Sequence, residues 1–286
     1  MMHYLGRRLA GAIPVLWGVA TLVFVLMRLL PGDPATLMLA EGGGSATAVT
    51  ELRAALGLDR PLWVQYERYL FRLIRGDLGT SLFTHRSVAV TIAEQLPSTI
   101  ELALAAMGVA IVVGGSLGLL GALRQGTWID ALVTGLSVVG VSLPIYWSAL
   151  LLIWVLSIWL GWFPATGKGG LAHLMMPALV LGFASSGVIA RLVRASLLEV
   201  LNQDFMITAR AKGLGEGVLL LRHALKNALI PVITVIGLQF GFLLSGTVVT
   251  ETIFARPGIG RLLVQAILWK DFPLVQGIVL LAALVY

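Results

Sequence analysis

The sequence predicts an all-α integral membrane protein whose helices cross the bilayer six times. Of its 286 residues, 58% are hydrophobic and only 12% are charged, whereas an average soluble domain has about 25% charged residues. A soluble core of this length could not bury so much apolar surface, so the bilayer is the natural solvent for the chain. Cysteine is absent, which excludes disulfide bonds and thiolate metal sites. The composition therefore indicates one membrane domain.

The expected spans follow from the apolar runs. A membrane-spanning helix needs about 20 apolar residues. Five runs meet this requirement, at residues 9–30, 99–123, 129–160, 173–193 and 229–249. The third run contains Pro144 and is long enough for a tilted or broken helix. A sixth run starts near Pro273 and stops at Tyr286, so we expect the chain to end within its last span.

The direction of the spans follows from the basic residues in the short loops, which favour the cytoplasmic side. With the N-terminus inside, the inner segments hold nine basic residues: Arg7, Arg8, Arg124, Arg191, Arg194, Arg210, Lys212, Arg222 and Lys226. The short outer loops hold four: Lys168, Arg256, Arg261 and Lys270. The long segment 31–98 carries six more, but loops beyond about 60 residues have little influence on orientation. We therefore predict a cytoplasmic N-terminus.

The sequence predicts three regions. Residues 1–30 form the N-terminus and first span, residues 31–98 an outer helical segment, and residues 99–286 the core domain with a cytoplasmic hairpin at 195–230. In the outer segment, apolar residues recur at helical spacing opposite a polar face that carries three arginines. The apolar positions are Trp63, Tyr66, Leu70, Leu73 and Ile74. This pattern favours an amphipathic helix, which either packs on the membrane domain or serves as a lid or a docking surface.

No catalytic constellation is visible. The four histidines are scattered, and neither an HExxH motif, a GxSxG elbow nor a GxxxxGK[ST] phosphate loop is present. The chain is therefore expected to be non-catalytic, with no metal site and no ATP hydrolysis of its own. The centres of spans two to five also lack ionisable residues, which a proton- or sodium-coupled carrier usually needs. A secondary carrier is the weaker alternative, and the energy source is expected to lie outside this chain.

A few polar residues interrupt the third and fifth runs. They are Ser142, Tyr146, Gln239, Ser245 and Thr247. Two interpretations are open: hydrogen bonds between packed helices, or the wall of a polar translocation pathway.

The most unusual stretch is the basic, glycine-punctuated segment 208–231. Ala209, Gly213 and Gly217 are spaced four residues apart, which predicts a stripe of small residues on one helical face. Pro231 is expected to open the fifth span. The segment is either an ordinary basic loop or a docking surface for a partner. The candidate docking residues are Thr208, Ala209, Arg210, Ala211, Lys212, Gly213, Leu214 and Gly217.

This segment carries a resemblance to a known family. TARAKGL at 208–214, followed by RHALKNALIP at 222–231, resembles the cytoplasmic "EAA" loop of ABC importer permeases, most closely those of dipeptide, oligopeptide and nickel systems. YLGRR at 4–8, RLLPGDP at 28–34, RGDLGTS at 75–81, ETIF at 251–254, PGIGRL at 257–262 and DFPLVQG at 271–277 resemble other stretches of that family, in the same order. Ile207, Thr208 and Ala209 stand at the "EAA" positions, so the glutamate is missing.

The resemblance implies a six-span type I importer fold (MetI-like) with a long outer loop that contains amphipathic helices. It implies a second homologous permease subunit, two ATP-binding subunits that carry ATP and magnesium, and an extracytoplasmic substrate-binding protein. Residues 209–217 would form the coupling helix on an ATPase. The chain would bind no cofactor and no nucleic acid, contact lipid in a bacterial or archaeal cytoplasmic membrane, and import di- or oligopeptides. Nickel chelates, glutathione or another small solute are the alternative substrates.

Overall fold

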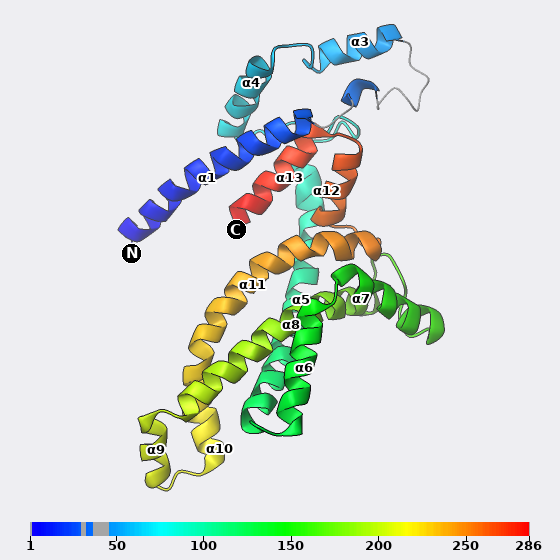
Figure 1. Ribbon diagram of the computed structural model, residues 1–286. Helices are drawn as coiled ribbons and strands as arrows, with labels where there is room; N and C mark the ends of the chain where they lie inside the picture. The colour runs from blue at the N-terminus through cyan, green and yellow to red at the C-terminus, as the bar shows by residue number, and fades with distance from the viewer. Residues whose placement is uncertain (1, 30–32, 37–45, 286) are drawn as a thin grey trace. The chain divides into compact units, whose positions relative to one another are not determined.

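The computed structural model describes residues 2–29, 33–36 and 46–285. Within these ranges the chain is helical, and its β-structure is limited to an isolated bridge between Thr80 and Ser87. The chain divides into two compact units, residues 1–97 with 261–286, and residues 98–260. The boundaries fall inside α5 (Val88–Leu123) and α12 (Ile259–Leu268). Figure 1 labels the helices.

The first unit is built on α1 (Met2–Leu29), which packs beside α13 (Phe272–Val285) (Figure 1). The outer segment forms α3 (Ala46–Ala55) and α4 (Leu62–Ile74). The Phe24 ring holds α4 on α1 by an edge-on contact with Tyr66 and a stacked contact with Tyr69, with ring centroids 5.1 and 5.6 Å apart. The expected helix at the outer segment is therefore present, and the apolar run of residues 11–29 qualifies as a span.

The second unit is centred on α8 (Leu171–Leu201). Among the candidate spans of the described residues, α8 has the largest buried share of its apolar stretch. Glycines bring its backbone close to α5. A Cβ at Gly114 or Gly118 would lie 2.6 Å from the carbonyl oxygen of Ser186 or 2.5 Å from that of Ala190. Small residues let membrane helices approach closely where no hydrophobic effect drives them together. The close contact of α5 with α8 therefore requires glycine, which has no side chain, at positions 114 and 118.

The third apolar run is a broken helix. It forms α6 (Trp128–Ser142), α7 (Ile145–Leu152) and a π-helix, η1 (Ile153–Trp159), with a bend of 103° between the two halves. Leu143 is extended at the break and Pro144 caps α7, because a residue before proline disfavours the helical conformation. The predicted interruption at Pro144 is confirmed.

The hairpin consists of α9 (Asp204–Ala211), α10 (Glu216–Val218) and the π-helix η2 (Leu219–Ala224), followed by α11 (Leu225–Ile253). In η2 the N–H of Leu225 donates to the carbonyl of Leu220, five residues back. The expectation that Pro231 opens the fifth span is wrong, because Pro231 lies inside α11. The apolar stretch that qualifies as a span already begins in α10 and covers residues 216–244.

Candidate functional site

The hairpin between α8 and α11 exposes the residues that the sequence singled out. Met206 of α9 and Leu219 of η2 are buried in a cluster with Leu197 of α8. This cluster fixes the hairpin to the ends of both long helices. Of the candidate docking residues, Ala209 is half-buried and the others are exposed. The structure therefore exposes seven of the eight residues on a hairpin that is anchored by buried contacts, and their docking role stays a prediction.

The predicted stripe of small residues is wrong. Helix α9 ends at Ala211, and Gly213 adopts a left-handed conformation with φ +77°. The N–H of Gly213 donates to the carbonyl of Arg210 at 2.9 Å, and the N–H of Leu214 donates to that of Ala209 at 3.4 Å. These are the two bonds of a Schellman helix end. Ala209 and Gly217 thus lie on different helices, and Gly213 forms the turn between them.

Ion pairs brace this region at two levels. On the hairpin, Arg210 Nε lies 3.0 Å from Glu216 Oε1 and joins α9 to α10. Both side chains are well exposed, so the pair contributes about 0–1 kcal/mol. Between α8 and α6, Arg194 donates to both oxygens of Asp130 at 2.6 and 2.7 Å. This pair is more enclosed and bidentate, a geometry that is stronger and more specific.

A groove of about 470 Å³ adjoins the hairpin. Its lining includes Ser196 and Glu199 of α8, Phe205 of α9, and Asn227 of α11. Polar side chains of α8 and α11 and the ring of Phe205 thus surround a space beside the exposed α9, which can receive part of a bound partner.

The candidate pathway residues lie at two places. Ser142 and Tyr146 are exposed on either side of the α6–α7 break, and Gln239 is half-buried on α11. Thr247 is fully buried and its hydroxyl donates to the carbonyl of Leu244 at 2.7 Å, which favours helix packing for this residue. The side chain of Ser245 lies outside the described residues. The pathway assignment stays a prediction.

Sequence reasoning missed a buried polar cluster where α11 ends. Glu251 is fully buried; its Oε1 accepts a bond from the Thr99 hydroxyl at 2.6 Å and its Oε2 one from the Gly260 N–H at 2.8 Å. The Thr99 oxygen in turn accepts the N–H of Ile259 at 2.8 Å. A carboxylate thus ties the turn after α11 to α5. The signal in the sequence was an acidic residue closing an apolar run.

Arg256 belongs to the same turn. Its side chain is fully buried, and its Nη2 lies 2.5 Å from Glu101 Oε2. From the sequence, Arg256 was counted only as a basic residue of a short outer loop. The turn packs directly against the Glu251 carboxyl group, because a Cβ at Gly258 would collide with that group. The turn is therefore a packed structural joint between α5 and α11.

Comparison with known families decides the nature of the chain. A family model described as "Binding-protein-dependent transport system inner membrane component" matches residues 110–286, and one for the N-terminal part of such membrane components matches residues 1–103. The chain belongs to this family. It is a multi-pass inner-membrane component of a transport system, as the apolar helices and the "EAA"-like segment indicated.

Individual relatives are similar over almost their full length. The dipeptide transport system permease protein DppB of Alkalihalophilus pseudofirmus is 41% identical over 314 residues, which cover 100% of this chain and 94% of the relative. The glutathione transport system permease protein GsiC of Salmonella paratyphi A is 43% identical over 284 residues, which cover 99% and 92%. GsiC of Escherichia coli K12 is 42% identical over the same length.

Solved structures agree in fold. The inward-facing MetNI methionine ABC transporter matches with a TM-score of 0.57 at 18% identity, over 68% of this chain and 90% of that chain. An amino acid ABC transporter with histidines matches with a TM-score of 0.50 at 16% identity, over 65% of this chain and 83% of that chain. The expected importer-permease fold (MetI-like) is thus confirmed.

Proposed function

We propose that this chain is the transmembrane permease subunit of an ATP-driven, binding-protein-dependent importer of peptides. The observation that carries the proposal is the similarity to a dipeptide permease over the whole chain. Glutathione, named for the second group of relatives, is itself a tripeptide. Dipeptides and glutathione are therefore the two substrates to compare, with glutathione as the second candidate.

In the proposed complex, this chain pairs with a second permease subunit, and the two form the translocation pathway. An extracytoplasmic binding protein delivers substrate, and two ATPase subunits carry ATP and magnesium. The N-terminus and the hairpin face the cytoplasm, which the excess of basic residues in the inner loops supports.

The hairpin supplies the coupling in this proposal. Helix α9 and the turn at Gly213 seat in a groove on one ATPase, where exposed Thr208, Arg210 and Lys212 set the register. Because Met206 and Leu219 bury the hairpin against α8, a displacement of its tip moves the long helices with it. Rigid-body rocking of these helices then exposes the pathway alternately to each side.

Uptake measurements test the proposal. The chain is expressed with its partner subunits in a host that lacks its own dipeptide and glutathione permeases, and uptake of each labelled substrate is followed. We expect uptake of one of them to require ATP and to disappear when this chain is omitted. Uptake that survives ATP depletion while the proton gradient is intact would instead support a secondary carrier.

A further inference from the structure

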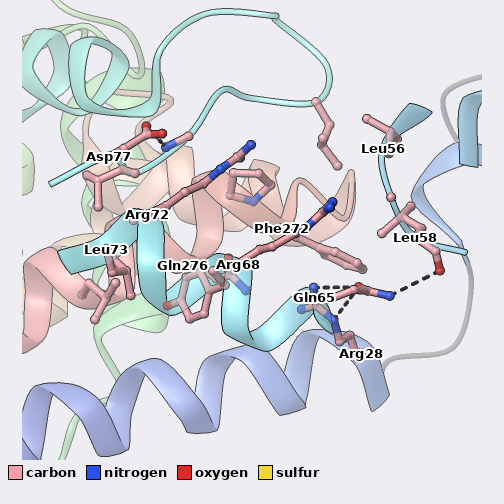
Figure 2. Close-up of a pocket in the computed structure, with 18 residues that line it drawn as sticks. Arg28, Leu56, Leu58, Gln65, Arg68, Arg72, Leu73, Asp77, Phe272 and Gln276 are labelled. Atoms are coloured by element: carbon pink, nitrogen blue, oxygen red, sulfur yellow. Dashed lines mark hydrogen bonds between the residues drawn. The ribbon is translucent and has the colours of Figure 1, made fainter. Parts of the chain in front are cut away.

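A cavity of about 170 Å³ lies in the first unit, between α4, the loop that follows it and α13 (Figure 2). Arg28 from the end of α1, Arg68, Tyr69 and Arg72 from α4, and Gln276 from α13 contribute to its lining. Since about 10–15 Å³ of such space is enough to hold one water, the cavity has room for several water molecules. A group of the size of a phosphate fits in it.

The charge around the cavity is positive. Asp77 is the acidic residue in its lining, and it accepts the N–H of Gly79 at 2.8 Å. Arg28 is held by Gln65, whose Oε1 accepts from its Nε and Nη2 at 3.1 and 3.0 Å (Figure 2). The guanidinium groups of Arg68 and Arg72 make no ion pair or hydrogen bond with any described residue. Two guanidinium groups therefore remain available to an anion.

Two more donors at the cavity lack a partner. The Tyr69 hydroxyl and the Gln276 Nε2 are buried, and neither has a hydrogen-bond partner among the described residues. Gln276 is only 6% exposed. Burial raises the pKa of Tyr69 to about 12, so its hydroxyl stays protonated and can donate. Buried donors without acceptors are costly, and a ligand rich in acceptor oxygens would satisfy them.

We expect the cavity to lie at the depth of the lipid head groups. Arg28 stands at the carboxyl end of the apolar run 11–29 of α1, where a spanning helix reaches the interface. Helix α4 turns its polar face to the cavity and leaves Leu62, Trp63 and Ile74 61%, 69% and 84% exposed. An amphipathic helix with an exposed tryptophan on its apolar face is typical of a membrane interface.

We propose that this cavity binds the phosphate of an anionic phospholipid head group. Arg68 and Arg72 bind the phosphate oxygens by charge-assisted hydrogen bonds, and Tyr69 and Gln276 donate to the remaining oxygens. The acyl chains lie along the apolar side of α1, whose Trp17 and Leu22 are exposed. Inorganic phosphate offers the same oxygens without this apolar contact, so it should bind more weakly. Phosphatidylcholine carries a positively charged choline group, which the arginines would repel.

Native mass spectrometry of the full chain, titrated with phosphatidylglycerol, tests the proposal. The double variant R68Q/R72Q is compared with R60Q/R75Q, which removes the same charge from exposed arginines at the two ends of α4 that do not line the cavity. We expect R68Q/R72Q to weaken the first bound lipid at least tenfold and R60Q/R75Q to weaken it less than twofold. Equal losses would show diffuse attraction to an anionic lipid and overturn the proposal, as would no loss in R68Q/R72Q.

A second variant separates binding from folding. Gln276→Leu removes a buried unpaired amide, so the lipid-free chain should unfold at the same temperature or higher, while affinity for phosphatidylglycerol falls about three- to tenfold. Unchanged affinity would exclude Gln276 from the site. Phosphatidylcholine is expected to bind at least tenfold more weakly. If inorganic phosphate binds as tightly as phosphatidylglycerol, or an acidic peptide displaces the lipid, the ligand is not a lipid head group.

Discussion

The glycines between α5 and α8 allow a sharp test of how the second unit is held together. Gly114 faces α8, whereas its neighbour Gly115 has no atom within 4 Å of the position that a Cβ would take. Alanine at Gly114 would place a Cβ 2.6 Å from the Ser186 carbonyl oxygen and 2.9 Å from Ile189 Cβ. Carbon–oxygen contacts between helices are normally about 3.3–3.6 Å. The two helices would have to separate by about 0.7–1 Å.

The expected free energies follow from this geometry. Overpacking of this kind costs about 1–3 kcal/mol, so Gly114→Ala should lower the free energy of unfolding by that amount. Gly115→Ala should raise it by about 0.5–1 kcal/mol, because alanine restricts the unfolded chain more than glycine does. The two adjacent substitutions therefore have opposite signs, although both add one methyl group to α5.

Unfolding of the purified chain in mixed micelles, followed by circular dichroism as the fraction of denaturing detergent rises, measures the difference. We expect the midpoint for Gly114→Ala to fall and that for Gly115→Ala to stay or rise, with about 1.5–4 kcal/mol between them. Equal midpoints would refute the close approach of α5 and α8.

Three further predictions concern the hairpin and the charged residues. Gly213→Val should cost about 1–2 kcal/mol of hairpin stability, because L residues disfavour the left-handed conformation, and should reduce co-purification of the ATPase subunits; Gly213→Asn, which tolerates that conformation, should retain them. Asp130→Asn should lower the unfolding temperature more than Arg210→Gln, because the pair of Asp130 with Arg194 is bidentate and more enclosed; equal losses in thermal unfolding would contradict the difference in enclosure. Glu101→Gln should cost about 1–3 kcal/mol by leaving Arg256 buried without its carboxylate, and adding Arg256→Met should recover part of the loss; a double variant less stable than Glu101→Gln alone would exclude this explanation.

Local sequence chemistry predicted much of the fold. Apolar length identified the helices long enough to span a membrane, since each must satisfy its own backbone in lipid. The break at Pro144 could be predicted because a proline disfavours the helical conformation of the residue before it in any fold. The amphipathic pattern of α4 was also local, because it depends only on helical periodicity.

The failures concern contacts and conformations that periodicity does not encode. The pattern of Ala209, Gly213 and Gly217 fits a helix equally well whether glycine sits inside it or ends it. Glu251 is held by Thr99 and Arg256 by Glu101, each partner more than 150 residues away along the chain. The phosphate-sized cavity joins arginines of α4 to Gln276 of α13, and no spacing along the chain indicated that meeting.

The π-helix η2 sets the direction in which the hairpin faces. Successive residues of an α-helix are rotated by about 100° about its axis. The hydrogen-bonded turn of η2 contains one residue more than a turn of the adjoining α-helices. Deleting the exposed Leu221 would turn η2 into an ordinary helical turn and rotate α9 and α10 by about 100° about the axis of α11. Met206 would then leave its buried cluster, although no residue of the docking surface had changed. The orientation of the hairpin therefore depends more on the number of residues in η2 than on their side chains.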